Sequence, residues 1–227
     1  MLQEGALESF QQRLGYQFKQ PDLLQQALTH RSAKGDHNER LEFLGDSILG
    51  FVTAANLYQT FPKADEGQLT RLRAQLVKEK TLADLAKELD IGPILSLGGG
   101  ELKSGGFRRA SILSDAFEAV LGAIYLDSDI DSVSRVIEGL YQSRYAELTL
   151  DKADKDPKTQ LQEWLQSRKH PLPDYEVIRM EGKEHNRTYW VSCSVTAFDL
   201  QSEGVGSSRR KAEKAAASLM LEKIYER

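Results

Sequence analysis

The chain has 227 residues, of which 40% are hydrophobic, and a formal net charge of −4. This length allows one or two domains with an apolar core. The sequence has no apolar run long enough for a transmembrane helix, and its first residues lack the pattern of a secretory signal. The single cysteine, Cys193, excludes an intrachain disulfide and a cysteine-based metal cluster. We therefore expect a cytoplasmic protein.

Residue periodicity divides the chain into an all-α part, residues 1–150, and an α+β part, residues 157–227, joined by a charged linker at 151–156. In the first part, helices are predicted at residues 5–14, 21–29, 38–60, 66–77, 80–88, 110–126 and 131–147. The glycine-rich segment from Leu97 to Gly106 is predicted to be irregular. The second part has the order α-β-β-β-α, with helices predicted at 157–168 and 207–225 and strands at 174–181, 187–196 and 199–205.

Three acids share one side of the predicted helix 38–60. At about 100° per residue, Glu39, Glu42 and Asp46 fall on a narrow stripe, and no basic residue follows one turn later to balance them. The opposite, apolar side is predicted to contain Leu41, Leu44, Ile48 and Phe51. Carboxylates grouped in this way repel one another unless a cation binds between them, and oxygen ligands suit Mg²⁺. An ordinary solvated helix face is the alternative.

A second acidic pair lies in the predicted helix 110–126. Asp115 and Glu118 are the only charged residues between Ile112 and Leu126, and at a spacing of three they share one face. A segment that is apolar all round belongs in a protein interior, where an unpartnered carboxylate is costly. We expect these two acids to meet Glu42 and Asp46 across a helix contact and to share one or two metal ions. Alternatively, they lie at the exposed end of the helix.

The segment Asn38–Gly50 (NERLEFLGDSILG) resembles the signature of bacterial ribonuclease III, an endonuclease specific for double-stranded RNA. Asp65–Gly67 and Gly100–Ala119 (GELKSGGFRRASILSDAFEA) match the same family, as does the order of the two domains. The resemblance implies a helical endonuclease domain at 1–150 and a double-stranded-RNA-binding domain at 157–227.

This resemblance assigns catalytic and metal-binding roles to Glu42, Asp46, Asp115 and Glu118, with Mg²⁺ as the metal and Mn²⁺ as a substitute. Asp46 is also the candidate for positioning or deprotonating the attacking water, and Glu39 and Glu66 match two supporting acids. The implied reaction is hydrolysis of duplex RNA to 5′-phosphate and 3′-hydroxyl ends with short 3′ overhangs, in precursors of ribosomal, messenger and some transfer RNAs. Two alternatives are an RNA-binding regulator that does not cut, and a metal enzyme acting on another phosphoester.

Phe43 points to the acidic side of the same helix by the angular estimate. A single exposed phenylalanine is common, but the family resemblance implies a two-fold homodimer, in which a pocket of the partner subunit would receive Phe43.

The second domain resembles a double-stranded-RNA-binding domain most clearly between Gly204 and Ala216. Ser207 or Ser208 is predicted to cap a helix whose first turn carries three cations: Arg209, Arg210 and Lys211. Cations there oppose the helix dipole, so bound phosphates explain them better than stability does; a solvated lysine-rich helix is the alternative. The resemblance implies further RNA contacts from the first helix of this domain and from the loop after its first strand. The predicted RNA contacts are therefore Thr159, Gln160, Glu163, His185, Ser208, Arg209, Arg210, Lys211 and Lys214. Trp164 and Trp190 are predicted to pack between helix and sheet.

Three cations precede the second acidic helix: Lys103, Arg108 and Arg109. They are candidates for guiding the RNA backbone to the metal site, or they merely neutralise nearby acids. His30 is predicted to hold local structure. The sequence offers no Ser–His–Asp or Cys–His arrangement for nucleophilic catalysis.

Overall fold

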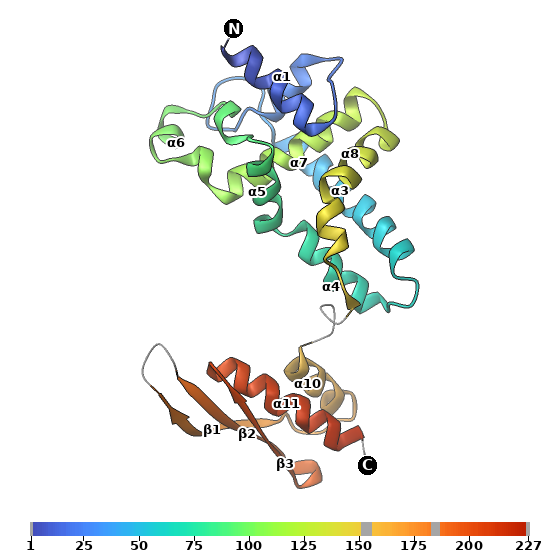
Figure 1. The fold of residues 1–227 in the computed structure, drawn as a ribbon, viewed down its shortest axis with the longest axis vertical. Coiled ribbons are helices and arrows are strands. Elements are labelled where there is room, and N and C mark those ends of the chain that lie inside the picture. The colour runs from blue at the N-terminus through green and yellow to red at the C-terminus, as the bar shows by residue number, and fades with distance from the viewer. Residues whose placement is uncertain (1, 151–155, 183–186, 226–227) are drawn as a thin grey trace. The chain divides into compact units, whose positions relative to one another are not determined.

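A computed structural model of the chain describes residues 2–150, 156–182 and 187–225, with the backbone alone for residues 2–4. It divides into two compact units, Met1–Ala153 and Asp154–Arg227 (Figure 1). No helix within these described ranges is long and apolar enough to cross a membrane. The predicted fold class, a helical domain followed by an α+β domain, is confirmed.

The first unit is built from helices. These are α1 (Leu2–Leu14), α2 (Pro21–Ala27), α3 (Glu39–Thr60), α4 (Glu66–Val77), α5 (Glu79–Glu88), α6 (Gly99–Lys103), α7 (Ala110–Asp127) and α8 (Ile130–Ala146), with short 3₁₀ turns at Gly92–Ile94 and Gly106–Arg108. The prediction of an irregular glycine-rich segment was wrong in part, because α6 and the second 3₁₀ turn lie within or next to it.

Helix α7 forms the centre of the first unit. Its residues are apolar all round, and α2, α3, α5 and α8 all contact it. Its side chains Phe117, Leu121 and Ile124 are completely buried. Asp115 and Glu118 are half-buried along this helix, so the surrounding helices leave an opening toward their face.

Two glycines let α3 and α7 touch backbone to backbone. A Cβ atom placed on Gly45 would lie 1.8 Å from the carbonyl oxygen of Glu118, and one on Gly122 would lie 2.3 Å from the carbonyl oxygen of Leu41. Real Cβ atoms do not come this close to backbone, because carbon–oxygen contact begins well beyond 3 Å. The glycine pair therefore fixes how near the acids of α3 lie to those of α7.

The second unit is a three-stranded antiparallel sheet with two helices. Strands β1 (Asp174–Glu181), β2 (Thr188–Val195) and β3 (Leu200–Gly206) pair in the order β1-β2-β3. Helices α10 (Pro157–Ser167) and α11 (Arg209–Tyr225) pack together, and the core between them and the sheet contains Leu161, Leu165, Cys193, Val195 and Met220. The small residues Gly204 and Gly206 bring β3 against α11, since a Cβ on either would clash with the α11 backbone.

Two aromatic residues lie on a different side of their elements than predicted. Phe51 is 64% exposed, so it does not belong to the apolar side of α3. Trp190 is half-buried on β2, and Arg179 lies over its ring at 4.8 Å. Because side chains alternate along a strand and Cys193 and Val195 face the helices, Trp190 faces away from them. Trp164 packs against Phe198 beside the core, as predicted.

Candidate metal centre

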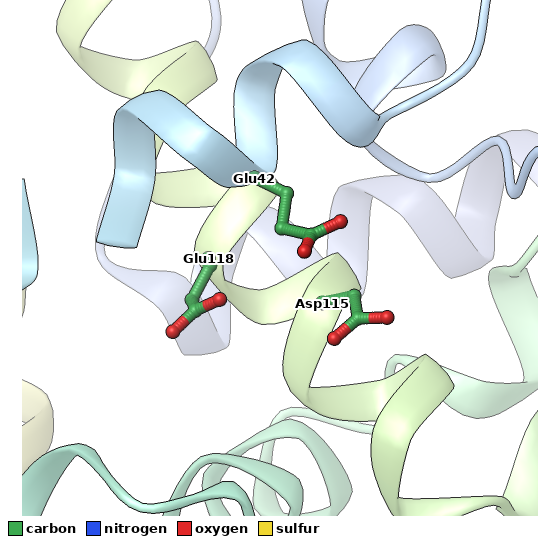
Figure 2. A group of neighbouring side chains, drawn as sticks. All are labelled: Glu42, Asp115 and Glu118. Atoms are coloured by element: carbon green, nitrogen blue, oxygen red, sulfur yellow. The ribbon is translucent and has the colours of Figure 1, made fainter. Parts of the chain in front are cut away.

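Three carboxylates from two helices converge in the first unit. Glu42 projects from α3, and Asp115 and Glu118 project from α7 (Figure 2). One oxygen from each lies within 4.8 Å of the others. Two oxygens on opposite sides of one divalent ion are about 4–5 Å apart, since metal–oxygen bonds measure about 2.0–2.6 Å. The spacing and the all-oxygen donor set therefore fit a single hard cation.

Burial and mutual repulsion keep protons on this acid group. Burial, together with the smaller effects of the charges of Asp46, Glu42 and Asp115, raises the pKa of Glu118 to about 8. The pKa of Glu42 is raised by burial and then by Asp115 and Glu39. Burial likewise raises the pKa of Asp115, although a hydrogen bond from Ser114 opposes the effect. Among the described residues no basic side chain forms an ion pair with these three acids, so a metal ion is the cation that would stabilise their charged forms.

The other predicted acids occupy separate positions. Asp46 is exposed one turn after Glu42 and does not join the group of three, although its charge acts on Glu118. Glu39 forms an ion pair with Arg31 at 3.0 Å and approaches His37 at 3.5 Å. No basic residue follows these acids one turn later in the helix, as the sequence indicated, but Arg31 from the loop before the helix balances Glu39.

Glu66 lies at the start of α4, away from the acid group. It accepts a hydrogen bond from Thr70 at 2.9 Å and lines a hollow between α3 and α4 with Tyr58 and Arg73. The structure thus does not bring Glu66 to the other acids within one chain.

A hollow of about 420 Å³ opens beside the acid group. Glu42 and Asp115 form one side, and the rest of the lining includes His30, Arg31, Asn38, Arg109 and Ser111. The sequence pattern did not identify Arg31, Asn38 or Ser111 as site residues, because each comes from a loop or helix end whose position depends on the tertiary fold.

His30 has the structural role that was predicted. Its Nδ1 atom contacts the Ser32 hydroxyl at 2.8 Å and accepts from the Ser32 backbone N–H at 3.2 Å. Ser32 in turn accepts from the Gly98 N–H, so this network ties the loop after α2 to the start of α6.

The three cations before α7 differ in their surroundings. Arg109 pairs with Glu101 at 3.0 Å and lines the hollow. Arg108 lies over the Phe107 ring at 4.9 Å, and Lys103 is exposed at the end of α6. Arg109 therefore neutralises a nearby acid, Glu101, whereas the exposed Lys103 and Arg108 stay candidates for RNA contact.

The basic start of α11 forms the candidate RNA-binding surface of the second unit. Ser208 caps this helix by accepting from the Lys211 N–H at 3.3 Å. Arg210 and Lys211 are exposed and form no ion pair within the described part of the chain. By contrast, Arg209 pairs with Glu213 at 2.9 Å and Lys214 pairs with Asp156 at 2.6 Å. Helix α10 presents Thr159, Gln160 and Glu163 at the surface, and His185 lies outside the described residues.

Comparison with known proteins finds a matching family for each of the two units. Residues 20–144 match the ribonuclease-III-like family and residues 157–224 match the double-stranded RNA binding motif. Ribonuclease 3 of Vibrio atlanticus is 54% identical over 218 residues, covering 96% of this chain and 97% of that protein. The Vibrio cholerae enzyme is 55% identical over 212 residues, covering 93% and 94%. The chain belongs to the ribonuclease III family.

A solved structure supports the assignment for the first unit. The nuclease domain of ribonuclease III from Campylobacter jejuni is 41% identical, with a TM-score of 0.60, covering 62% of this chain and 99% of that one. The chain is thus an endoribonuclease of the ribonuclease III family with a double-stranded-RNA-binding domain. The family is metal-dependent, and Glu42, Asp115 and Glu118 form an acidic cluster that could hold a metal in this ribonuclease III chain.

The raised pKa of Glu118 predicts an unusual pH dependence of stability. A carboxyl whose folded pKa exceeds its unfolded value of 4.5 costs stability as pH rises toward and through about 8. In metal-free protein at pH 9, Glu118→Gln should therefore raise the free energy of unfolding, by about 1–3 kcal/mol after allowing for solvent screening. Denaturant unfolding at pH 5 and pH 9 in chelator would measure this. Equal stability of variant and wild type at both pH values would contradict the repulsion.

Proposed function

We propose that this endoribonuclease uses Mg²⁺ to hydrolyse phosphodiester bonds of duplex RNA, giving 5′-phosphate and 3′-hydroxyl ends with short 3′ overhangs. The convergence of Glu42, Asp115 and Glu118 within 4.8 Å carries the proposal. Residues 1–150 would form the nuclease and residues 157–227 the RNA-binding domain, with 151–156 as linker. The proposed substrates are precursors of ribosomal, messenger and some transfer RNAs in the cytoplasm, and Mn²⁺ would substitute for Mg²⁺.

We assign the acids different roles according to their positions. Glu42, Asp115 and Glu118 would hold the ion, which would supply a coordinated water of lowered pKa and stabilise negative charge on the departing 3′ oxygen. Asp46 is exposed beside this group, so its carboxylate can accept a hydrogen bond from the attacking water and orient it. Glu39, paired with Arg31, and Glu66 are the supporting acids of this proposal.

Incubation with a long RNA duplex tests the proposal against its alternatives. We expect short duplex products in Mg²⁺, none with chelator, and binding without cleavage in Ca²⁺, whose longer and looser coordination suits catalysis poorly. End labelling should detect 5′-phosphates and 3′-hydroxyls. Binding without products in Mg²⁺ and Mn²⁺ would favour a regulatory protein that does not cut.

A homodimer through α3 is part of the proposal. Phe43 is 78% exposed, and Phe51 and Tyr58 on the same helix are 64% and 73% exposed. The three fall within about 80° around the helix axis. An exposed apolar stripe of this kind is typical of a protein interface, and a two-fold axis would make the contact reciprocal and give one acid group for each RNA strand.

Phe43→Asp should dissociate this dimer and suppress paired cleavage of the two strands together. A charge buried at an apolar interface is costly to desolvate, so we expect the dissociation constant of the dimer to rise at least about 100-fold. Sedimentation and duplex cleavage would be measured on the same samples, with Gln12→Asp on the exposed side of α1 as a charge-matched control. A wild type that is monomeric while making paired, staggered cuts would overturn the dimer.

Phosphate contact at the start of α11 predicts a change in salt dependence. Each neutralised phosphate releases counterions, so Arg210→Ala or Lys211→Ala should lower the slope of log K against log salt by roughly 1. Arg209 and Lys214 already pair with acids, and we expect smaller changes there. Lys223→Ala, near the other end of α11, is the control. An affinity loss confined to one duplex sequence would be inconsistent with phosphate recognition.

A further inference from the structure

Asn38 has a buried hydrogen-bond donor without an acceptor. It occupies the position just before α3, where asparagine commonly caps the helix through its side-chain oxygen, yet it makes no capping hydrogen bond. The residue is 2% exposed, and its Nδ2 atom has no hydrogen-bond partner among the described residues. Buried donors in folded proteins are almost always paired, so this amide is suited to an acceptor supplied from outside the chain.

Asn38 is one of the residues that line the hollow beside the acid group. This hollow of about 420 Å³ is also lined by Glu39, Glu42 and Asp115. The volume is in the range of sites that bind one small ligand or one nucleotide. An acceptor that satisfies Asn38 would therefore come close to the proposed metal ligands.

The charges around the hollow decide which acceptor fits. Arg31 is engaged by Glu39 and Arg109 by Glu101, each at 3.0 Å. The lining thus offers a neutral amide next to carboxylates, with both arginines already paired. A phosphodiester can only accept hydrogen bonds and offers nothing to the carboxylates beside Asn38, whereas a hydroxyl can accept from the amide and donate to a carboxylate at the same time.

We propose that Asn38 binds the 2′-hydroxyl of a nucleotide adjacent to the cleaved bond and so helps the nuclease domain to distinguish RNA from DNA. The 2′-hydroxyl is the group that separates the two polymers at a given position, and it is both donor and acceptor. The inference rests on the proposed function for its location at the cleavage site. Asn38 is then a specificity-determining residue that touches the ribose and takes no part in the chemical step.

Single 2′-deoxy substitutions test this contact. Duplexes carrying one deoxynucleotide at each position within three of the cleaved bond would be compared under single-turnover conditions in Mg²⁺. For wild type we expect one position at which the deoxy substitution slows cleavage about 3- to 10-fold, the effect of one neutral hydrogen bond. Asn38→Ala should slow cleavage of the all-ribose duplex by the same factor. At that one nucleotide position, and at no other, a deoxy substitution should not slow the variant further. Asn56→Ala, the same change further along α3, is the matched control.

Two outcomes would overturn the proposal. One is a wild-type enzyme whose cleavage rate no single deoxy substitution lowers. The other is that, at every position, the rate loss from Asn38→Ala and the rate loss from the deoxy substitution multiply, because independent effects of this kind would mean that Asn38 contacts none of these 2′-hydroxyls. Asn38→Ser, which keeps a small polar side chain before α3, covers the case in which alanine unfolds the protein, because serine is too short to replace the amide and should give the same non-additive pattern. If wild type fails to cleave at all, the proposed function fails, and the same comparison made on binding in Ca²⁺ still decides the role of Asn38.

Discussion

Glu118→Ala is expected to abolish RNA cleavage while leaving duplex binding intact. Glu118 supplies one of three carboxylates within 4.8 Å of one another, and removing it leaves two ligands for the ion. We expect a loss on the order of 10³-fold or more in the single-turnover rate in Mg²⁺, because the ion supplies both the nucleophile and stabilisation of the leaving group. Binding of duplex in Ca²⁺ should stay close to wild type, since the second unit carries the basic helix start.

Asp131→Ala is the matched control for this experiment, because Asp131 is an exposed acid in the first turn of α8, outside the group. Cleavage by Glu118→Ala at near the wild-type rate would mean that the metal site has been assigned to the wrong residues.

Gly45→Ala should separate the two helices that hold the acids. The added Cβ would lie 1.8 Å from the Glu118 carbonyl oxygen, a contact with backbone that side-chain rotation cannot relieve. We expect a loss of about 3 kcal/mol or more in the free energy of unfolding, together with a loss of cleavage, since Glu42 and Glu118 would move apart. Thermal unfolding and single-turnover cleavage would be measured on the same preparation.

Gly139→Ala on α8 is an internal control for Gly45. A Cβ there meets nothing within 4 Å, so alanine should stabilise α8 slightly, by about 0.5–1 kcal/mol. Equal stability and activity of the two alanine variants would show that the close contact of α3 and α7 does not matter.

Local sequence signals predicted the regular elements well. The predicted bounds of α4 and β1 agree with the structure, and for α4 the reason is a capping box in which Asp65 and Gln68 bond each other's backbone. The glycine-rich segment before α7 was harder, because α6 and its neighbouring 3₁₀ turn depend on contacts such as the Arg109–Glu101 ion pair rather than on periodicity.

Helical spacing brought Glu42, Asp115 and Glu118 together correctly, because the α3–α7 contact places one stripe of each helix face to face. It could not separate Asp46 from them, since one further turn along α3 carries Asp46 toward solvent. Nor could it find Arg31 beside Glu39, because that partner comes from a loop outside the helix. Trp190 was misplaced for a similar reason, since a large aromatic ring predicts burial but strand alternation decides which face of the sheet it occupies.

Metal position is the most direct test of the catalytic assignment. Crystals of the protein soaked in Mn²⁺ would be measured at a wavelength where manganese scatters anomalously, with Glu118→Ala crystals treated in the same way. We predict an anomalous peak between the carboxylates of Glu42, Asp115 and Glu118 in the wild type and a strongly reduced peak in the variant. A wild-type peak elsewhere, or none among these acids at saturating Mn²⁺, would contradict the account.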